Sequence, residues 1–166
     1  MKRLQSPFLT MPLWAAVGAA LVALSPRPWL AFAGFATWPA VEYAAHRWAM
    51  HGLAGRAPRL YKRVHGVHHL FPRDLSHFVI PIPAVGVAAC AIGAALWAGG
   101  VGLAPLGGLL LAFVLYDLAH LAAHGLAPFP FREALRRHHA RHHEDDARNF
   151  GVTSPALDRL LGTRAP

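Results

Sequence analysis

Four long apolar stretches constrain the possible folds of this chain more than any other feature of its sequence. They cover residues 8–24, 28–45, 78–100 and 101 to about 119. Each approaches the roughly 20 residues that an α-helix needs to cross the hydrocarbon core of a bilayer. Prolines separate the first two stretches and glycines separate the last two, and both residue types favour turns. We therefore predict an all-α integral membrane protein with four transmembrane helices, built as a single domain over residues 1–166.

The first apolar stretch also resembles a secretory signal peptide, because Lys2 and Arg3 precede it. The residues that follow it, Ser25-Pro26-Arg27-Pro28, do not form a small-residue cleavage site. A second apolar stretch then begins at once. We expect the first stretch to remain in the protein as a membrane helix.

The uneven distribution of basic residues bears on the orientation of the chain. The sequence is 55% apolar and 14% charged, yet its formal net charge is +8. If both termini are cytoplasmic, only Arg27 of the sixteen Lys and Arg residues lies on the opposite side. Cytoplasmic segments of membrane proteins are enriched in Lys and Arg. We therefore place both termini and the polar segments 47–73 and 132–164 in the cytoplasm, and attribute the charge to topology and anionic lipid rather than to nucleic acid.

The only cysteine in the sequence, Cys90, lies within the third apolar stretch. It cannot form an internal disulfide. We expect it to act as a small buried apolar residue.

Ten of the twelve histidines form four groups on the predicted cytoplasmic side. The groups are His46 and His51 in HRWAMH, His65, His68 and His69 in HGVHH, His120 and His124 in HLAAH, and His139, His142 and His143 in HARHH. Residues three or four positions apart project from one helix face and can converge on one ion. A lone histidine is more often a surface or core residue than a ligand, but ten in a repeated pattern indicate a metal site. Because imidazole is a common ligand of iron, zinc and copper, ten nitrogens suit two ions with five or six ligands each. The sequence thus predicts a cytoplasmic helical cap with a histidine-rich dimetal site.

One of the four groups departs from this spacing. His46 and His51 are five residues apart, which on an ideal α-helix separates their directions by roughly 140°. Either the two residues serve different metals or the helix unwinds between them. The sequence leaves both alternatives open.

Two acidic residues near the histidines are candidates for supporting the ligands. Glu42 lies four residues before His46, and Asp117 lies three residues before His120. Unpaired charge is costly at membrane depth, so each carboxylate needs a partner. Accepting the outer N–H of a ligating imidazole would satisfy a carboxylate and fix the tautomer of the ring. Pairing with a nearby arginine such as Arg47 is the alternative.

His77 and His138 fall outside the spacing of the four groups. We interpret them as residues that support the ligands or face the substrate. An ordinary surface position is the alternative for both.

The four histidine groups, in this order, resemble those of the fatty acid hydroxylase superfamily, which includes fatty acid 2-hydroxylases, sterol desaturases, sterol methyl oxidases and carotenoid hydroxylases. The similarity extends from about Glu42 to Thr163 and rests on HRWAMH, HGVHH, HLAAH and HHARHH. The closing segment NFGVTSPALDRLLGT, residues 149–163, also resembles the stretch that follows the last histidine group in the hydroxylase and sterol desaturase branches. Four ordered groups and this closing segment make the resemblance specific.

The resemblance implies an oxygen-dependent diiron monooxygenase or desaturase whose metal ligands are the ten grouped histidines. Oxidation of an unactivated C–H bond requires a redox-active metal, so iron is the expected working metal, although zinc can occupy such ligands in a purified sample. The sequence has no haem-domain, flavin or nicotinamide motif. We therefore expect electrons to come from a separate ferredoxin or cytochrome. Arg136, Arg137 and Arg141 are a candidate docking surface for that acidic partner, or simply a solvated charge cluster.

Three functions are compatible with the sequence. The first is hydroxylation of a fatty acyl chain that enters between the helices, with Trp48, Phe71, Phe78 and Trp97 as candidate wall residues or interface anchors. The second keeps the chemistry but changes the substrate to a carotenoid or sterol, with desaturation as a further outcome. The third is a non-enzymatic membrane metal store or transporter, which predicts ligands along the transmembrane path rather than at one end.

Overall fold

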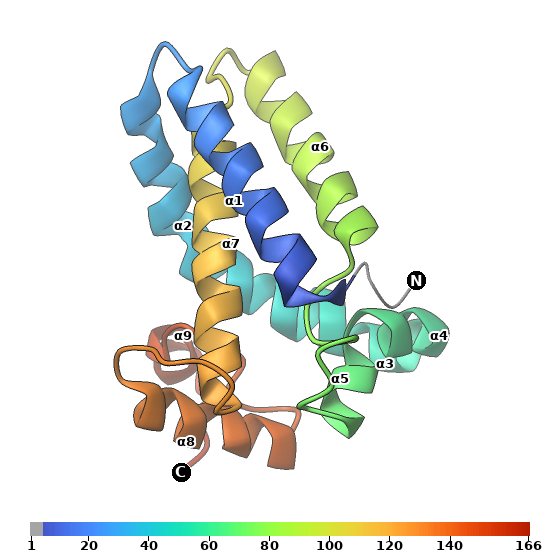
Figure 1. Cartoon of the computed structure of the whole chain (residues 1–166). Helices are drawn as coiled ribbons and strands as arrows, with labels where there is room; N and C mark the ends of the chain where they lie inside the picture. Colours follow the sequence, from blue (N-terminus) through green and yellow to red (C-terminus); the bar gives the residue numbers. More distant parts are fainter. Residues whose placement is uncertain (1–4) are drawn as a thin grey trace.

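The computed structural model describes residues 5–166 of the chain. Four long helices form the stem of the molecule (Figure 1). They are α1 (Pro7–Ala23), α2 (Ala31–Ala44), α6 (Ile82–Ala98) and α7 (Ala104–Ala123). Each helix corresponds to one predicted apolar stretch, and the turns lie at the predicted prolines and glycines. The short 3₁₀-helix η2 (Pro28–Leu30) leads into α2. The prediction of an all-helical architecture is confirmed for the described residues.

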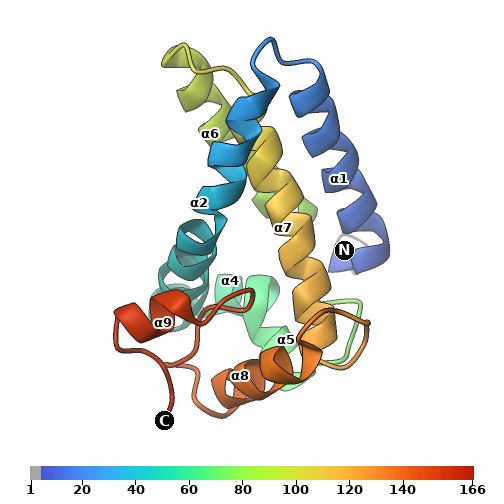
Figure 2. The ribbon, with the colours of Figure 1, turned by 90° about the vertical axis from the view of Figure 1, so that its left-hand side faces the viewer.

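The two histidine-rich polar segments lie together at one end of the stem (Figures 1 and 2). The first contains α3 (Leu53–Arg56), α4 (Pro58–Tyr61) and α5 (Val67–Leu70), and the second contains α8 (Arg132–Glu144) and α9 (Ala156–Leu160). Two π-helical segments belong to the first part: η3 (Ala45–His51) joins α2 to α3, and η4 (Lys62–Gly66) joins α4 to α5. The two polar segments form a cap beneath the stem. They carry the groups at 65–69 and 139–143, while η3 and the lower end of α7 bring the groups at 46–51 and 120–124 to the same place.

Helix α7 is the centre of the stem and carries most of its core. Fourteen of its twenty residues are buried, and it packs against α1 and α2. The α2–α7 contact is close because Gly34 faces the backbone of Pro105 and Gly108 faces the backbone of Ala31. A Cβ atom at either glycine would overlap a carbonyl oxygen of the other helix. The absence of a side chain therefore allows α7 to lie against α2 and to deliver its lower end into the cap.

The outer surface of the stem is apolar. Phe32 is 80% exposed and Val87 is 73% exposed, and α6 has a single buried residue, Gly93, among its seventeen. A helix that is apolar on all sides, yet makes few contacts with the rest of the protein, is suited to a lipid environment. By length and composition, α7 alone among the described residues meets the requirement for crossing a membrane, while α1 and α6 are shorter apolar helices.

The position of Cys90 corrects one expectation from the sequence. Cys90 is exposed on α6, whereas we expected it to be buried. The reason is that α6 makes few contacts with the rest of the stem, so most of its apolar side chains face outward.

The close α2–α7 contact generates a prediction about stability. We expect Gly34→Ala to lower the free energy of unfolding by about 1–3 kcal/mol, because the added methyl group must push the two helices apart. Thermal unfolding in detergent micelles measures the change. Gly55→Ala is the matched control, because a Cβ atom there meets nothing within 4 Å. Equal loss of stability in both variants would contradict the role of this contact.

Candidate metal centre

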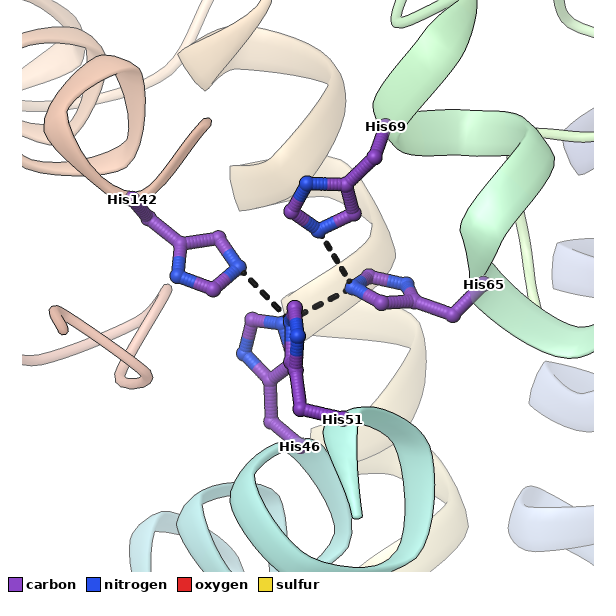
Figure 3. Close-up of side chains that lie close together, drawn as sticks. All are labelled: His46, His51, His65, His69 and His142. Carbon is purple, nitrogen blue, oxygen red and sulfur yellow. Dashed lines mark hydrogen bonds between the residues drawn. The ribbon is translucent and has the colours of Figure 1, made fainter. Parts of the chain in front are cut away.

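The ten histidines of the four groups converge in the cap as two separate clusters of five. The first cluster is His46, His51, His65, His69 and His142, and the second is His68, His120, His124, His139 and His143. Within each cluster the candidate ligand nitrogens all lie within 4.8 Å of one another. In the first cluster the side chains reach the centre from η3, from the η4–α5 segment and from α8 (Figure 3). The structure therefore joins every predicted ligand to a cluster and leaves none of the ten outside.

The π-helical segment η3 explains the unusual spacing of His46 and His51. In a π-helix each turn takes in more residues than in an α-helix, and the hydrogen bonds join residues five apart. Residues at positions i and i+5 therefore lie one above the other. The ring centroids of His46 and His51 are 5.0 Å apart, and both rings belong to the first cluster. Of the two alternatives left open by the sequence, the structure shows the local change in helix geometry.

The two HxxHH groups each contribute to both clusters. His65 and His69 enter the first cluster, while His68 enters the second. In the group on α8 the assignment to the clusters is the opposite: His139 and His143 enter the second cluster, and His142 enters the first. Residues four apart share a helix face, whereas consecutive residues point about 100° apart. Each group therefore bridges the two clusters and fixes their separation.

The spacing of the nitrogens is that of ligands around an ion rather than that of a hydrogen-bond network. His120 Nε2 lies 3.0 Å from His68 Nε2, 3.0 Å from His139 Nε2 and 3.2 Å from His124 Nε2. One ring nitrogen carries either one hydrogen or one lone pair, so it cannot satisfy three such contacts. Two ligands at right angles, each about 2.1 Å from a shared metal, are about 3.0 Å apart. The donor set and its spacing thus fit one ion per cluster.

Backbone carbonyl groups fix the tautomer of two rings in the first cluster. His46 Nδ1 donates to the carbonyl oxygen of Phe150 at 2.6 Å, and His142 Nδ1 donates to that of Arg148 at 2.7 Å. These bonds leave the Nε2 lone pairs facing the centre of the cluster. In the second cluster, the buried Nδ1 atoms of His68 and His139 have no hydrogen-bond partner among residues 5–166. The two clusters therefore differ in how their ligands are held.

Burial keeps the imidazole rings neutral. It lowers the pKa of His51 to about 3, with a further contribution from the nearby His142 ring. It likewise lowers the pKa of His143 to about 4, again with His142 as the second cause. Metal ligands must offer a free lone pair, which only the neutral ring has. The cap thus presents its imidazoles in the form that binds a cation at neutral pH.

The carboxylate of Glu42 lies at the junction of stem and cap. It is buried and accepts hydrogen bonds from the backbone N–H groups of Val152 and Thr153, from the Thr153 hydroxyl and from the Trp38 indole. Its partners among the described residues are therefore the closing segment and α2, neither an imidazole nor Arg47. Glu42 is linked to the first cluster indirectly, through the chain next to Phe150.

The remaining candidate residues have different surroundings. Asp117 is buried in α7, and neither of its oxygens has a hydrogen-bond partner among residues 5–166. His77 lies outside both clusters and contacts Asp74 and Ser76. His138 also lies outside both clusters and donates from Nε2 to Asp158 Oδ2 at 3.3 Å.

Asp158 is a residue that the sequence did not single out. It is fully buried and accepts hydrogen bonds from the backbone N–H groups of Phe150 and Gly151 at 2.8 and 2.9 Å. The sequence did contain a signal for it. Asp158 is the single acidic residue of the closing segment NFGVTSPALDRLLGT, and a carboxylate among apolar residues needs hydrogen-bond donors when it is buried.

An apolar cavity of about 370 Å³ lies between α2, α6 and α7, next to η3 and η4. Its walls include Ala45, Met50 and Val64, which adjoin the first-cluster residues His46, His51 and His65 in sequence. Further walls are Trp38, Val85, Ala88, Ile92, Leu110 and Phe113. An apolar space of this size beside the clusters suits a hydrocarbon chain.

The four aromatic wall candidates divide between two environments. Phe78 is buried and its ring centroid lies 4.6 Å from that of His120. Trp48, Phe71 and Trp97 are exposed, and none of the four predicted residues, Phe78 included, lines the cavity. Phe78 is thus the one of the four whose ring contacts a cluster.

Comparison with known proteins agrees with this geometry. A family model described as fatty acid hydroxylase matches residues 31–163, which include both clusters, Glu42 and Asp158. The chain belongs to the fatty acid hydroxylase family. Among solved structures, full-length scs7p, of which only the hydroxylase domain is visible, shares the fold with a TM-score of 0.82 and 23% sequence identity. That match covers 98% of this chain and 67% of the other.

Curated members of the family are similar over most of this chain. A dihydroceramide fatty acyl 2-hydroxylase of Arabidopsis thaliana is 30% identical over 137 residues, covering 78% of this chain and 58% of the relative. The ceramide very long chain fatty acid hydroxylase scs7 of Schizosaccharomyces pombe is 32% identical over 149 residues, covering 80% of this chain and 41% of the relative. The fatty acid 2-hydroxylase of Homo sapiens is 30% identical, covering 84% of this chain and 40% of the relative. This fatty acid hydroxylase family chain thus spans about half the length of the curated relatives it matches.

The lowered pKa values predict that the metal-free protein loses stability in acid. Unfolded histidines bind a proton near pH 6.5, whereas His51 and His143 in the folded state do so only at about 3 and 4. Between these values the unfolded state holds more protons, so stability falls as the pH decreases below about 6.5. Thermal unfolding of the chelator-treated protein from pH 8 to pH 5 measures the effect.

Two histidine variants serve as controls for this pH dependence. His143→Gln removes one depressed pKa and should flatten the decline. His77→Gln changes a ring outside both clusters and should leave the decline unchanged. A wild-type protein that is equally stable at both pH values would contradict the buried, neutral rings.

Proposed function

We propose that this chain is an oxygen-dependent lipid hydroxylase that inserts oxygen into a C–H bond of a fatty acyl chain at a diiron centre. The observation that carries the proposal is the pair of five-histidine clusters beside an apolar cavity. A purely structural or transport site needs no such cavity, and a soluble substrate needs no apolar wall. The relatives named above are hydroxylases of fatty acyl groups and ceramides, which supports the choice of substrate class.

Iron is the metal that suits the proposed reaction, with zinc as a substitute in purified material. Each ion would be held by the five imidazoles of its cluster. When bound, the iron pair supplies the redox chemistry that activates molecular oxygen toward a C–H bond. The neutral rings supply lone pairs, and the hydrogen bonds of His46 and His142 to backbone carbonyls keep those lone pairs aimed inward.

The cavity would bind the acyl chain and exclude water from it. Its described walls are apolar side chains from α2, η3, α6 and α7, so a hydrocarbon chain can be bound without leaving a polar group unsatisfied. Ala84 and Ala88 are exposed on α6, on the side from which a chain in the bilayer would enter. We place the reacting end of the chain at the cap and its tail between α2 and α6.

The same geometry supports a membrane location with the cap in the cytoplasm. The exposed apolar surface of α1, α2 and α6 would face lipid, and all four helices would cross the bilayer as one domain. Arg27 lies at the far end of the stem, where its guanidinium donates to the carbonyl oxygens of Gly100 and Val101. Lys2 and Arg3 lie outside the described residues. The other basic residues of the described part lie in the polar segments 47–73 and 132–164, as expected for a cytoplasmic face.

A separate ferredoxin or cytochrome would deliver the electrons. Arg136, Arg137 and Arg141 are exposed on α8, the helix that also carries ligands of both clusters. An acidic donor bound there would lie next to the metal centre. The positive surface would steer such a partner to the cap.

The proposed reaction predicts loss of a lipid product when a first-cluster ligand is removed. We expect cells that express the chain, with iron and a reductase partner supplied, to contain a lipid with one added oxygen. The amount of this lipid should be at least about 100-fold lower in cells that express His142→Ala. Mass spectrometry of lipid extracts measures the product. Arg56→Ala, which changes an exposed residue on α3, is the control and should retain it.

The identity of the product separates the competing functions. An oxygenated carotenoid or sterol would change the substrate, and a new double bond would change the reaction to desaturation. Lipid extracts that are identical with and without the wild-type chain, despite bound iron, would contradict the enzymatic proposal.

The cavity predicts selectivity for chain length. Ala88→Trp places a large ring in the cavity wall and should raise KM for long acyl chains more than for short ones. Val87→Trp adds the same ring one residue earlier on α6, where the side chain is exposed and outside the cavity, and should leave the ratio unchanged. Rates measured with acyl substrates of two lengths test this, and equal effects of both variants would place the chain elsewhere.

A further inference from the structure

The loop from Arg148 to Thr153 accepts hydrogen bonds from two ligands of the first cluster. The carbonyl oxygen of Arg148 accepts from His142 Nδ1, and that of Phe150 accepts from His46 Nδ1. Between them, Asn149 has a left-handed backbone (φ 54°), a conformation that Asn tolerates better than most residues. Its side chain bridges the His138 carbonyl and the Ala165 N–H. The loop therefore serves as the acceptor for two of the five ligands in one cluster.

Two buried carboxylates hold this loop through four consecutive backbone N–H groups. Asp158 accepts those of Phe150 and Gly151 at 2.8 and 2.9 Å. Glu42 accepts those of Val152 and Thr153. A hydrogen bond to a charged acceptor is stronger than one between neutral groups. The loop is thus fixed at every position from 150 to 153.

A single peptide group links Asp158 to a metal ligand. The N–H of the Phe150–Gly151 peptide donates to Asp158 Oδ2, and the carbonyl of the same peptide accepts from His46 Nδ1. When a carboxylate accepts a hydrogen bond from the N–H of a peptide group, the negative charge on the carbonyl oxygen of that group increases, because linked hydrogen bonds polarise one another. The ring of His46 then becomes a more basic ligand, as when a carboxylate bonds to a ligating histidine directly.

Asp158 is held in place by side chains that are not ligands. Thr163 donates its hydroxyl to Asp158 Oδ1 at 2.8 Å, and His138 donates to Oδ2 at 3.3 Å. The Thr163 hydroxyl is also 2.9 Å from the Tyr43 hydroxyl on α2. A Cβ atom at Gly151 would approach Asp158 Oδ2 and overlap the Ser154 carbonyl, so the carboxylate can lie this close only to glycine.

We propose that Asp158 is a positioning residue that acts through the Phe150–Gly151 peptide on His46 and so raises the metal affinity of the first cluster alone. Glu42 holds the other half of the same loop and supports the same ion. The buried Nδ1 atoms of His68 and His139 in the second cluster have no such acceptor among residues 5–166. This inference depends on the metal-binding part of the proposed function, and it makes the two sites unequal in affinity.

The test measures metal binding rather than activity. The full-length protein in detergent is stripped with chelator and titrated with Zn²⁺ against a competing chelator, for the wild type and for Asp158→Asn. The amide nitrogen introduced by this change is a donor and must face a backbone N–H, so one loop bond is lost. We expect one Zn²⁺ to bind with unchanged affinity and the other about 10–100-fold more weakly.

Two background variants assign the weakened ion to its cluster. In His120→Ala, which disables the second cluster, adding Asp158→Asn should weaken the remaining ion. In His65→Ala, which disables the first cluster, the same change should have no effect. Asp74→Asn is the matched control, because Asp74 also accepts hydrogen bonds from a backbone N–H, a hydroxyl and a histidine but lies outside both clusters.

Equal weakening of both ions, or no weakening of either, would overturn the proposal while leaving the proposed function intact. A wild-type protein that binds no Zn²⁺ and no Fe²⁺ would instead contradict the metal centre itself. If Asp158→Asn does not fold, Thr163→Val removes one bond to the carboxylate and leaves the loop bonds in place. It should weaken the same ion by a smaller factor, and an unchanged affinity for that ion would also overturn the proposal.

Discussion

Ten imidazole rings that face one another in the cap are the constraint on which the rest of this structure depends. Their nitrogens lie as close as 2.8 Å, with lone pairs directed at common centres. Lone pairs brought together in a buried space repel one another, and only a shared cation turns that arrangement into a favourable one. The rings come from η3, from the η4–α5 segment, from α7 and from α8, so the fold has to bring these elements to one place.

The stem provides the positions from which the rings converge. Helix α7 lies against α2 at Gly34 and Gly108. At the lower ends of these two helices, α7 carries His120 and His124, and α2 continues into η3 with His46 and His51. The π-helical geometry of η3 then aligns a pair of histidines that an α-helix would point in different directions. The stem therefore acts as a rigid support whose lower end determines the spacing of both clusters.

The closing segment completes the centre from the other side. Glu42 on α2 and Asp158 on α9 bind the same loop, and the carbonyl groups of that loop orient two ligands of the first cluster. The second cluster is bounded instead by Phe78 and by α7, on which the Asp117 carboxylate, without a hydrogen-bond partner among residues 5–166, precedes His120 by three residues. Two sites with the same number of imidazoles thus differ in how firmly their ligands are oriented.

The sequence by itself determined the helical stem, the cap at one end and the identity of the ten clustered histidines, because apolar stretches and i, i+4 spacing are local properties of the chain. The pairing of His65 with His69 and of His139 with His143 follows from the same spacing. Only the tertiary structure decided that His46 joins His51, since a π-helix is stabilised by its surroundings and leaves no mark in the spacing of apolar residues. The partners of Glu42 were likewise decided by a contact between residues 111 positions apart, and those of Asp158 by a loop conformation that no local pattern encodes. Cys90 is exposed because α6 makes few contacts with the rest of the stem, which its apolar sequence does not reveal. Local periodicity specifies faces of helices, whereas the choice of which faces meet depends on packing across the whole molecule.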